Sequence, residues 1–288
     1  MRSVKSGSAA EMHGEDTAKI LPRRIDRPRR HEILFSICTL VSNRKLYEQM
    51  CESFRLGGFS GGDVEYLYID NTAGNTFDAY AGLNCLISHA RGRYLILCHQ
   101  DVVLLDAGRP ELVERLGELD RLDPAWALAG NAGGDDRGRS IMHFSDRFGV
   151  EHKTDNLPAL ARSLDENFII LRNGCQLGFS NDLEGFHLYG TDICLQAEAR
   201  GWAAYVLDFH LRHDGEGTMD ESFWICRSNL EKKYGDFFQT RRIRTTCTIV
   251  LLAPSRLARA SKRRLQALRW YRRAIWKWMR GKPIPPRD

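Results

Sequence analysis

Between residues 33 and 101, short apolar runs rich in β-forming residues alternate with segments whose apolar residues recur at helical spacing. The runs Ile33–Val41, Val64–Ile69 and Tyr94–Cys98 are predicted to be strands, and Arg44–Leu56 and Phe77–Ala90 are predicted to be helices. Strands that alternate with helices form βαβ units, in which helices cover the faces of a parallel sheet. Right-handed crossovers place the carboxyl ends of such strands at one edge of the sheet. The chain is therefore predicted to have an α/β fold.

The following residues, up to about 240, continue this alternation less regularly. Helices are predicted at Pro110–Leu122, Gly190–Arg200 and about Glu221–Tyr234, and strands at Ala125–Ala132, Glu166–Arg172 and Ala203–Phe209. The stretch between Asn131 and Arg172 has the weakest pattern, with a polar loop predicted at residues 133–138. A chain of 288 residues is long enough for one large core with appendages.

Charge divides the chain into an acidic body and a basic tail. Residues 241–288 contain 15 Lys or Arg and one acid, whereas residues 1–240 contain 27 basic and 36 acidic side chains. Residues 1–30 are polar and lack the apolar centre of a signal peptide. We therefore expect a flexible leader at 1–30, the folded domain at 31–240 and a basic tail at 241–288. Such a division suggests that the tail meets an anionic partner, while the chemistry belongs to the domain.

The basic tail is predicted to contain an amphipathic helix. Its apolar residues recur near helical spacing between Ser255 and Arg280, and Trp270, Trp276 and Trp278 suit the interface between a membrane and water. An alternative is a helix that packs on the domain with its charged side in solvent. Nucleic acid is disfavoured as a partner, because the acidic domain would repel a phosphate backbone. No run of eighteen apolar residues is present, so any membrane contact is expected to be peripheral.

The eight cysteines are scattered through the chain, and no pair has the C-x-x-C spacing. Most of them lie in apolar segments, as reduced core cysteines do, which favours a cytoplasmic protein over one stabilised by disulfides. The spacings of zinc fingers and zinc ribbons are absent as well. We therefore expect a cytoplasmic location and no zinc site of these kinds.

Polar residues follow each of the first three predicted strands. They are Thr39–Ser42, Asp70–Asn71 and His99–Asp101. In open α/β sheets, ligands bind at the edge where such strand ends meet. The sequence contains neither the G-x-G-x-x-G pattern nor a P-loop, so another group has to hold a phosphate. A divalent cation on Asp101 would do so, because a hard cation binds carboxylate and phosphate oxygens together.

The segments that surround these strand ends resemble one enzyme family. They are similar to the nucleotide-sugar glycosyltransferases of the GT-A fold, closest to family 2, and within it to the subgroup whose metal motif reads His-Gln-Asp. The resemblance covers about residues 33–217 and is carried by Phe35–Val41, Tyr66–Thr72, Ala90–Asp101 and Gly185–Ala197. It implies a Rossmann-like mixed sheet flanked by helices, which the basic helical extension follows here.

The resemblance also implies a reaction. The expected activity is transfer of a hexosyl or deoxyhexosyl group from a nucleotide sugar to a hydroxyl of a glycan or a lipid-linked acceptor, with Mn²⁺ or Mg²⁺ as cofactor. Transfer is expected to invert the anomeric carbon, as part of polysaccharide biosynthesis at the inner face of the cell membrane. His99 replaces the first acid of the commoner Asp-x-Asp motif. An alternative is therefore a non-catalytic module that binds a sugar nucleotide and assists a partner enzyme.

Roles for single residues follow from the same resemblance. The residues expected to bind the donor are Thr39, Asp70, Asn71, His99 and Gln100. Asp101 and His213 are expected to ligate the metal ion. Asp192 is expected to be the general base that takes the proton of the acceptor hydroxyl, and its place near the amino end of a helix favours the ionised form.

Three of these assignments have plainer alternatives. Asp101 could cap the next element, and Asp70 could form an Asx turn with its own backbone. Asp192 could be a helix N-cap, a position where aspartate is common.

The histidine assignments also have alternatives. His99 or His210 could bind the metal ion, although neutral imidazole suits Mn²⁺ better than Mg²⁺. A core position for His213, or a role for Asp214, would explain its segment equally well. Glu166 is a further candidate for the acceptor site.

Overall fold

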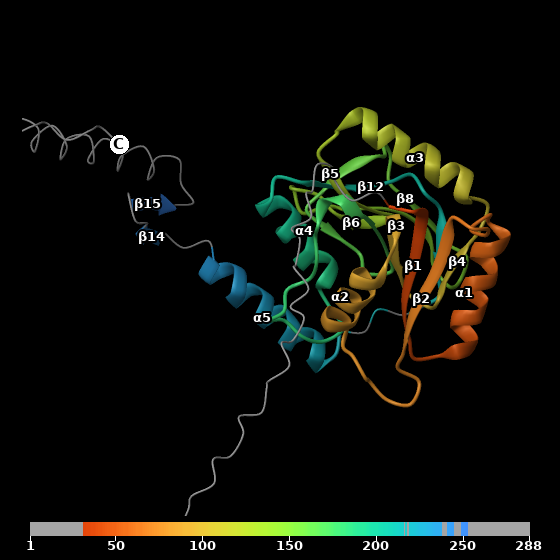
Figure 1. Cartoon of the computed structure of the whole chain (residues 1–288), viewed down its shortest axis with the longest axis horizontal. Coiled ribbons are helices and arrows are strands. Elements are labelled where there is room, and N and C mark those ends of the chain that lie inside the picture. Colours follow the sequence, from red (N-terminus) through yellow and green to blue (C-terminus); the bar gives the residue numbers. More distant parts are fainter. Residues whose placement is uncertain (1–30, 216, 218, 238–240, 245–248, 253–288) are drawn as a thin grey trace, which may run out of the picture. The chain divides into compact units, whose positions relative to one another are not determined.

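The computed structural model describes residues 31–215, 217, 219–237, 241–244 and 249–252. Its helices are α1 (Arg44–Leu56), α2 (Ala79–His89), α3 (Arg109–Leu122), α4 (Tyr189–Ala199) and α5 (Glu221–Phe237), with a 3₁₀ turn, η1, at Asn173–Cys175. Figure 1 shows α1 to α4 arranged around a twisted sheet.

The main sheet is mixed. Its strands, in spatial order, are β2 (Val64–Asp70), β1 (Ile33–Val41), β3 (Gly92–Cys98), β11 (Phe168–Arg172), β5 (Trp126–Gly130), β12 (Ala203–Val206) and β9 (Ala159–Ala161). β1 runs parallel to both β2 and β3, as the βαβ pattern predicts. β11 runs antiparallel to both β3 and β5, which makes the sheet mixed.

Helices cover both faces of the main sheet. Successive side chains of a strand point to opposite faces, so each strand contributes to two cores. On β3, Leu95 and Leu97 belong to the core that contains residues of α2 and α4. Tyr94 and Ile96 belong to the core that contains residues of α1 and α3. The predicted α/β class, a mixed sheet flanked by helices, is thus confirmed.

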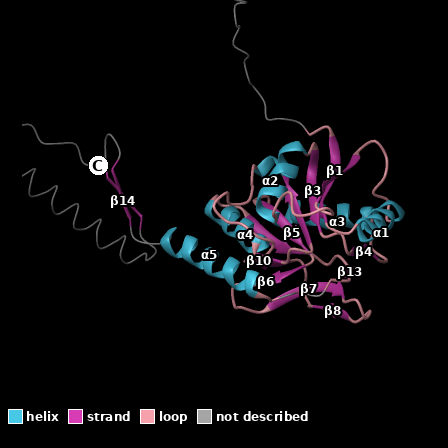
Figure 2. Ribbon diagram, turned by 90° about the horizontal axis from the view of Figure 1, so that it is seen from below, coloured by secondary structure: helices cyan, strands magenta, loops and turns pink. Residues whose placement is uncertain are grey.

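A second, smaller sheet lies beside the main one (Figure 2). In spatial order it contains β10 (Ser163–Leu164), β6 (Ala132–Gly134), β7 (Ser140–Ser145), β13 (Leu211–His213) and β4 (Val102–Leu104), and β8 (Glu151–Lys153) pairs with β7. The stretch with the weakest sequence pattern forms much of this sheet. The polar loop predicted at 133–138 is therefore partly strand, because β6 pairs with β7 there.

Local signals set the start of the first helix correctly. Asn43 caps α1, since its side-chain oxygen accepts hydrogen bonds from the backbone N–H groups of Lys45 and Leu46. The observed bounds of β1 and α1 equal the predicted ones, Ile33–Val41 and Arg44–Leu56.

The described part of the basic tail is not helical. It consists of β14 (Arg241–Arg244) and β15 (Ile249–Leu252), which pair antiparallel. The expected leader at 1–30 and the amphipathic helix expected at 255–280 lie outside the described residues. Among the helices that the structure describes, none is long and apolar enough to cross a membrane. The seven cysteines in the described part are free, in line with the expectation of reduced cysteines.

Candidate metal and donor site

Asp101 lies in the turn that connects the main sheet to the second sheet, between β3 and β4. The backbone N–H of Asp214 donates a hydrogen bond of 3.0 Å to the Asp101 carbonyl. β4 pairs with β13 so that Val102 lies opposite His213. This pairing brings His213 next to Asp101, although more than a hundred residues separate them in the sequence.

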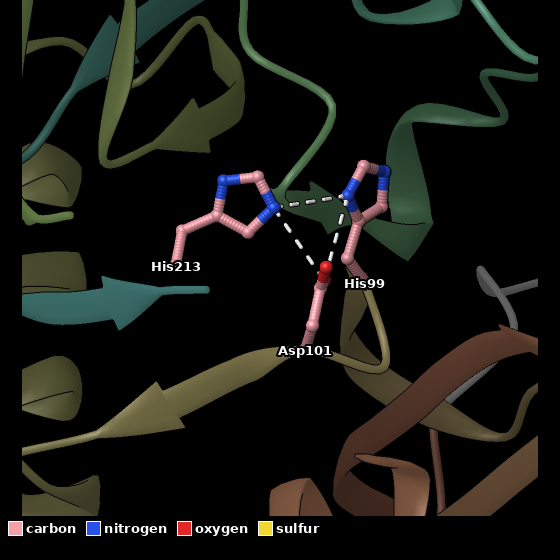
Figure 3. Close-up of side chains that lie close together, drawn as sticks. All are labelled: His99, Asp101 and His213. Atoms are coloured by element: carbon pink, nitrogen blue, oxygen red, sulfur yellow. Dashed lines mark hydrogen bonds and ion pairs between the residues drawn. The ribbon is translucent and has the colours of Figure 1, made fainter. Parts of the chain in front are cut away.

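His99, Asp101 and His213 converge on one point (Figure 3). Asp101 Oδ1 lies 3.4 Å from His213 Nε2 and 3.9 Å from His99 Nδ1, and the two ring nitrogens are 3.4 Å apart. Ligand atoms that share one ion at about 2.1 Å lie roughly 3.0 to 3.5 Å from one another. The three atoms therefore lie close to the positions that a single cation requires.

The electrostatics of the three groups suit metal binding. Burial lowers the pKa of His99, and the neighbouring His213 lowers it further, so the imidazole is neutral and has a lone pair to offer. Burial raises the pKa of Asp101, but His213 and His99 outweigh burial and leave the pKa below its usual value. Burial lowers the pKa of His213, but the Asp101 carboxylate outweighs it and raises the pKa. The raised pKa favours a proton on His213, next to the Asp101 carboxylate. A cation bound to Asp101 would take the place of this proton.

Two further observations fit a cation at this point. Asp101 Oδ1 is buried and has no hydrogen bond among the described residues, which is costly for a carboxylate oxygen. Gly215 borders the same point, since a Cβ at this position would lie 2.5 Å from Asp101 Oδ2 and 2.8 Å from His213 Nε2. The missing side chain keeps the space beside the carboxylate open. Two imidazoles and one carboxylate suit Mn²⁺ better than Mg²⁺.

A cavity of about 340 Å³ opens beside the three residues. It is lined by Leu40, Ser42, Asn71, Asn75, Ala79, Leu83, Leu97, Cys98, His99, Gln100, Asp101, Phe186 and Tyr189. The lining includes residues that follow β1, β2 and β3, which is the edge where the sequence predicts a ligand. Its size and its mixture of apolar and polar groups are typical of a small-molecule site.

Gln100 connects the metal motif to the end of the first strand. Its side-chain oxygen accepts hydrogen bonds from the backbone N–H groups of Ser42 (2.9 Å) and Asn43 (2.7 Å). Its amide nitrogen donates to the Ser42 hydroxyl at 2.8 Å. The middle residue of the His-Gln-Asp motif thus holds the start of α1 against the turn that carries Asp101.

Of the residues predicted to bind the donor, Asn71, His99 and Gln100 line the cavity, whereas Thr39 and Asp70 are not among the lining residues. Asn71 is buried, with 5% of its surface exposed to solvent. Its oxygen accepts hydrogen bonds from the backbone of Thr76 and Phe77, so it also shapes the loop beside the cavity.

The side chains of Thr39 and Asp70 contact other side chains and the backbone of the protein rather than the cavity. Thr39 is fully buried, and its hydroxyl lies 3.7 Å from the Cys98 sulfur. One Asp70 oxygen accepts hydrogen bonds from the backbone and hydroxyl of Thr72, and the other forms an ion pair of 2.6 Å with Arg44. The alternative interpretation of Asp70 as an Asx-turn residue describes this geometry.

Asp192 is fully buried in the first turn of α4 and is not among the residues that line the cavity. Its oxygens accept hydrogen bonds from the Ser180 backbone (2.8 Å), the Ser180 hydroxyl (2.6 Å) and the Tyr234 hydroxyl (2.6 Å). The N-cap position of α4 belongs to Leu188. The carboxylate therefore joins α4 to α5 and to the preceding loop, and its role as the general base stays a prediction.

Glu166 is an acid whose backbone carbonyl contacts Tyr189, a residue that lines the cavity, although Glu166 itself is not among the lining residues. The Tyr189 hydroxyl lies 2.9 Å from His99 Nε2 and donates a 3.3 Å hydrogen bond to the Glu166 carbonyl. The Glu166 carboxylate accepts a long hydrogen bond (3.4 Å) from the Gly190 backbone. Burial, and then the charge of Asp165, raises the pKa of Glu166 to about 8.

Sequence reasoning missed two residues of the site, Tyr189 and Gly215. A glycine two residues after a proposed ligand, His213, is a signal of close approach that could have indicated Gly215. Tyr189 has no such signal, because an aromatic residue at the start of a helix is equally typical of a core position.

Comparison with known proteins gives one clear relative. The chain is 38% identical over 229 residues to the Fuscovulum blasticum protein named ATP synthase subunits region ORF 6, and the match covers 77% of this chain and 92% of that protein. No family model matches the chain.

Two solved structures have a distant likeness to this one. A mannosyltransferase of Pyrobaculum calidifontis in complex with GDP-Man and Mn²⁺ has a TM-score of 0.47 and 11% identity, over 73% of this chain and 67% of that chain. S. aureus TarS in complex with UDP-GlcNAc has a TM-score of 0.44 and 9% identity, over 65% of this chain and 60% of that chain. At these TM-scores neither structure supports a comparison of single residues.

Proposed function

We propose that this chain, which belongs to the same family as the ATP synthase subunits region ORF 6 protein of Fuscovulum blasticum, is a metal-dependent glycosyltransferase that uses a nucleotide-sugar donor. The observation that carries the proposal is the convergence of His99, Asp101 and His213 beside a cavity at the carboxyl ends of parallel strands. The resemblance of residues 33–217 to GT-A enzymes supplies the reaction class.

In this proposal the cavity binds the nucleotide part of the donor, with the diphosphate directed to the three metal-binding residues. His99, Asp101 and His213 would hold Mn²⁺ or Mg²⁺, which offsets the negative charge that develops on a leaving diphosphate. Gln100 keeps Ser42 and the start of α1 in place around the donor. Asn71 borders the cavity and is proposed to contact the nucleotide.

We propose Glu166 as an alternative to Asp192 for the general base. A base has to take a proton from the acceptor hydroxyl near the donor sugar, and it works best with a pKa close to the working pH. The backbone carbonyl of Glu166 accepts a hydrogen bond from the cavity residue Tyr189, its carboxylate accepts one from the Gly190 backbone, and its pKa is raised to about 8. Asp192, the base expected from the sequence, has three hydrogen bonds to Ser180 and Tyr234 that support a structural role.

The finer features of the reaction rest on the resemblance alone. We propose that the transferred group is a hexose or deoxyhexose, that transfer inverts the anomeric carbon, and that the acceptor is a glycan or a lipid-linked sugar. The net charge of residues 241–288 supports attachment to an anionic membrane surface, where a lipid-linked acceptor would be available.

Turnover with a panel of nucleotide sugars and Mn²⁺ tests the proposal. We expect release of nucleoside diphosphate from at least one donor, with loss of more than 90% of the rate in Asp101→Asn. The matched control is Asp106→Asn, which changes an exposed carboxylate outside the cavity lining and should retain most of the rate. Donor binding without turnover in any condition would instead support the non-catalytic module.

A further inference from the structure

A second group of metal-binding side chains lies on the smaller sheet, away from the proposed catalytic site. His143 belongs to β7, Glu151 to β8, and His210 immediately precedes β13. One ligand atom of each residue lies within 4.8 Å of the other two. Three neighbouring chain segments thus each contribute one potential ligand to a single point.

The strand register sets these residues on one face of the sheet. β7 runs parallel to β13, and Phe144 lies opposite Leu211. Extending this register by one residue places His143 beside His210. Phe144 and Leu211 pack against the hydrophobic core on the other face, where His213 also points by alternation. The second group is therefore separate from the Asp101 site.

His143 and His210 are stacked with ring centroids 4.6 Å apart and an interplanar angle of 1°, so one of the two rings has to rotate before both nitrogen lone pairs can face the same ion. The His143 side chain is only 9% exposed, whereas that of Glu151 is 53% exposed. His143 Nε2 lies 3.1 Å from Glu151 Oε1. The cluster thus has one deeply buried ligand and one ligand that solvent can reach, which gives an ion a route of entry.

The surroundings of His143 favour a lone pair at Nε2. Nδ1 lies 2.7 Å from Asp208 Oδ1, close enough for an ion pair although the two atoms are not aligned as a hydrogen bond, so a proton on Nδ1 would lie beside a carboxylate. In metal sites a carboxylate at this position fixes the tautomer and orients the ring. With the proton on Nδ1, the lone pair of Nε2 faces the Glu151 carboxylate at 3.1 Å. Two electron-rich atoms at this distance require a second proton or a cation.

The charges of the cluster favour a cation. With neutral histidines, Glu151 and Asp208 contribute two negative charges, and Lys153 offsets one of them through its 2.9 Å ion pair with Asp208. The Ser145 hydroxyl lies 2.9 Å from His210 Nε2 and adds a further polar group to the site. Arg115 also donates to the Asp208 carbonyl, so the charge of Asp208 is offset, and Glu151 supplies the negative charge next to the two imidazoles.

We propose that His143, His210 and Glu151 form a second binding site, selective for a divalent transition metal and best suited to Zn²⁺. Two imidazole nitrogens and one carboxylate are a common ligand set for zinc, with the remaining position open to water or another oxygen. A bound ion would connect β7, β8 and the segment that leads into β13, the strand that carries His213. The site would therefore stabilise the strand on which the first metal site depends.

Metal stoichiometry tests the proposal in the full-length chain, after removal of any purification tag. Zn²⁺ is measured after equilibrium dialysis, and Co²⁺ gives a visible spectrum that reports the ligands. We expect two equivalents in the wild-type protein, one in Glu151→Gln or His210→Gln, and one in Asp101→Asn. His152→Gln on the same strand β8 is the matched control and should retain two. Glu151 is half exposed, so its substitution should not disturb folding.

Thermal unfolding provides a second measurement. Zn²⁺ at a hundredfold excess over its Kd should raise the Tm of Asp101→Asn by about 5 to 10 °C, and this rise should disappear when Glu151→Gln is added. Unchanged stoichiometry in both Glu151→Gln and His210→Gln would overturn the proposal. So would a single equivalent in the wild-type protein that is lost in Asp101→Asn, because the cluster of His143, Glu151 and His210 would then hold no ion.

Discussion

Substitution of Gly215 by alanine should fill the space beside the proposed metal ion without changing any ligand. The added Cβ would lie 2.5 Å from Asp101 Oδ2 and 2.8 Å from His213 Nε2. A Cβ atom cannot approach a nonbonded oxygen or nitrogen atom to less than about 3 Å without steric overlap, so the carboxylate or the imidazole has to move. Gly215 does not have a positive φ, so alanine is compatible with the backbone itself.

The magnitude follows from how metal sites respond to displaced ligands. Substitutions among the groups that surround and orient metal ligands typically cost about 10- to 100-fold in metal affinity, which corresponds to roughly 1.4 to 2.8 kcal/mol. Asp101 is partly buried in the turn between β3 and β4 and borders the cavity, so its carboxylate can shift rather than disrupt the fold, and we expect a loss within this range. Without metal, the stability of the variant should stay close to that of the wild-type protein.

Calorimetric titration with Mn²⁺ measures this loss. Gly217→Ala is the matched control, because a Cβ at Gly217 would meet nothing within 4 Å. The control should bind Mn²⁺ as the wild-type protein does, and Gly215→Ala should bind at least about tenfold more weakly. An affinity of Gly215→Ala within twofold of the wild-type value would refute the geometry proposed for the ion.

Three further predictions follow from the described residues and the tail. Because a base acts in its ionised form, kcat/KM should rise with pH and level off above about 8. Glu166→Gln should remove this rise with pH and most of the activity, and an unchanged pH profile would exclude Glu166. Asp192→Asn should lower the free energy of unfolding by about 1 to 3 kcal/mol in urea denaturation, because it disrupts the hydrogen bonds to Ser180 and Tyr234, and an unchanged midpoint would contradict the structural role. Deletion of residues 253–288 should abolish co-sedimentation with anionic vesicles, and equal sedimentation of both forms would remove the membrane from the account.

The sequence predicts the first half of the main sheet well, because the signals there are local. The Asn43 cap and the helical spacing of apolar residues define α1, and the apolar run before His99 defines β3. The position of Asp101 at a strand end follows from the same pattern.

The second sheet could not be predicted in this way. Its strands are short, and β4 and β13 consist of three residues each, too few for a periodic pattern. Their pairing is non-local, so the position of His213 opposite Val102 depends on tertiary structure. The meeting of His143 and His210 has the same origin.

Asp192 illustrates a different limit. An acid in the first turn of a helix has the same sequence signal whether it faces a cleft or the protein interior. Only the arrangement of α4 and α5 shows that its oxygens are bonded to Ser180 and Tyr234.

Binding of nucleoside diphosphates, measured by calorimetry with and without Mn²⁺, tests the central claim most directly. The account predicts that at least one nucleoside diphosphate binds more than tenfold more tightly when Mn²⁺ is present, and that Asp101→Asn removes this gain. Equal affinity with and without the ion for every nucleotide, or an intact gain in Asp101→Asn, would contradict it.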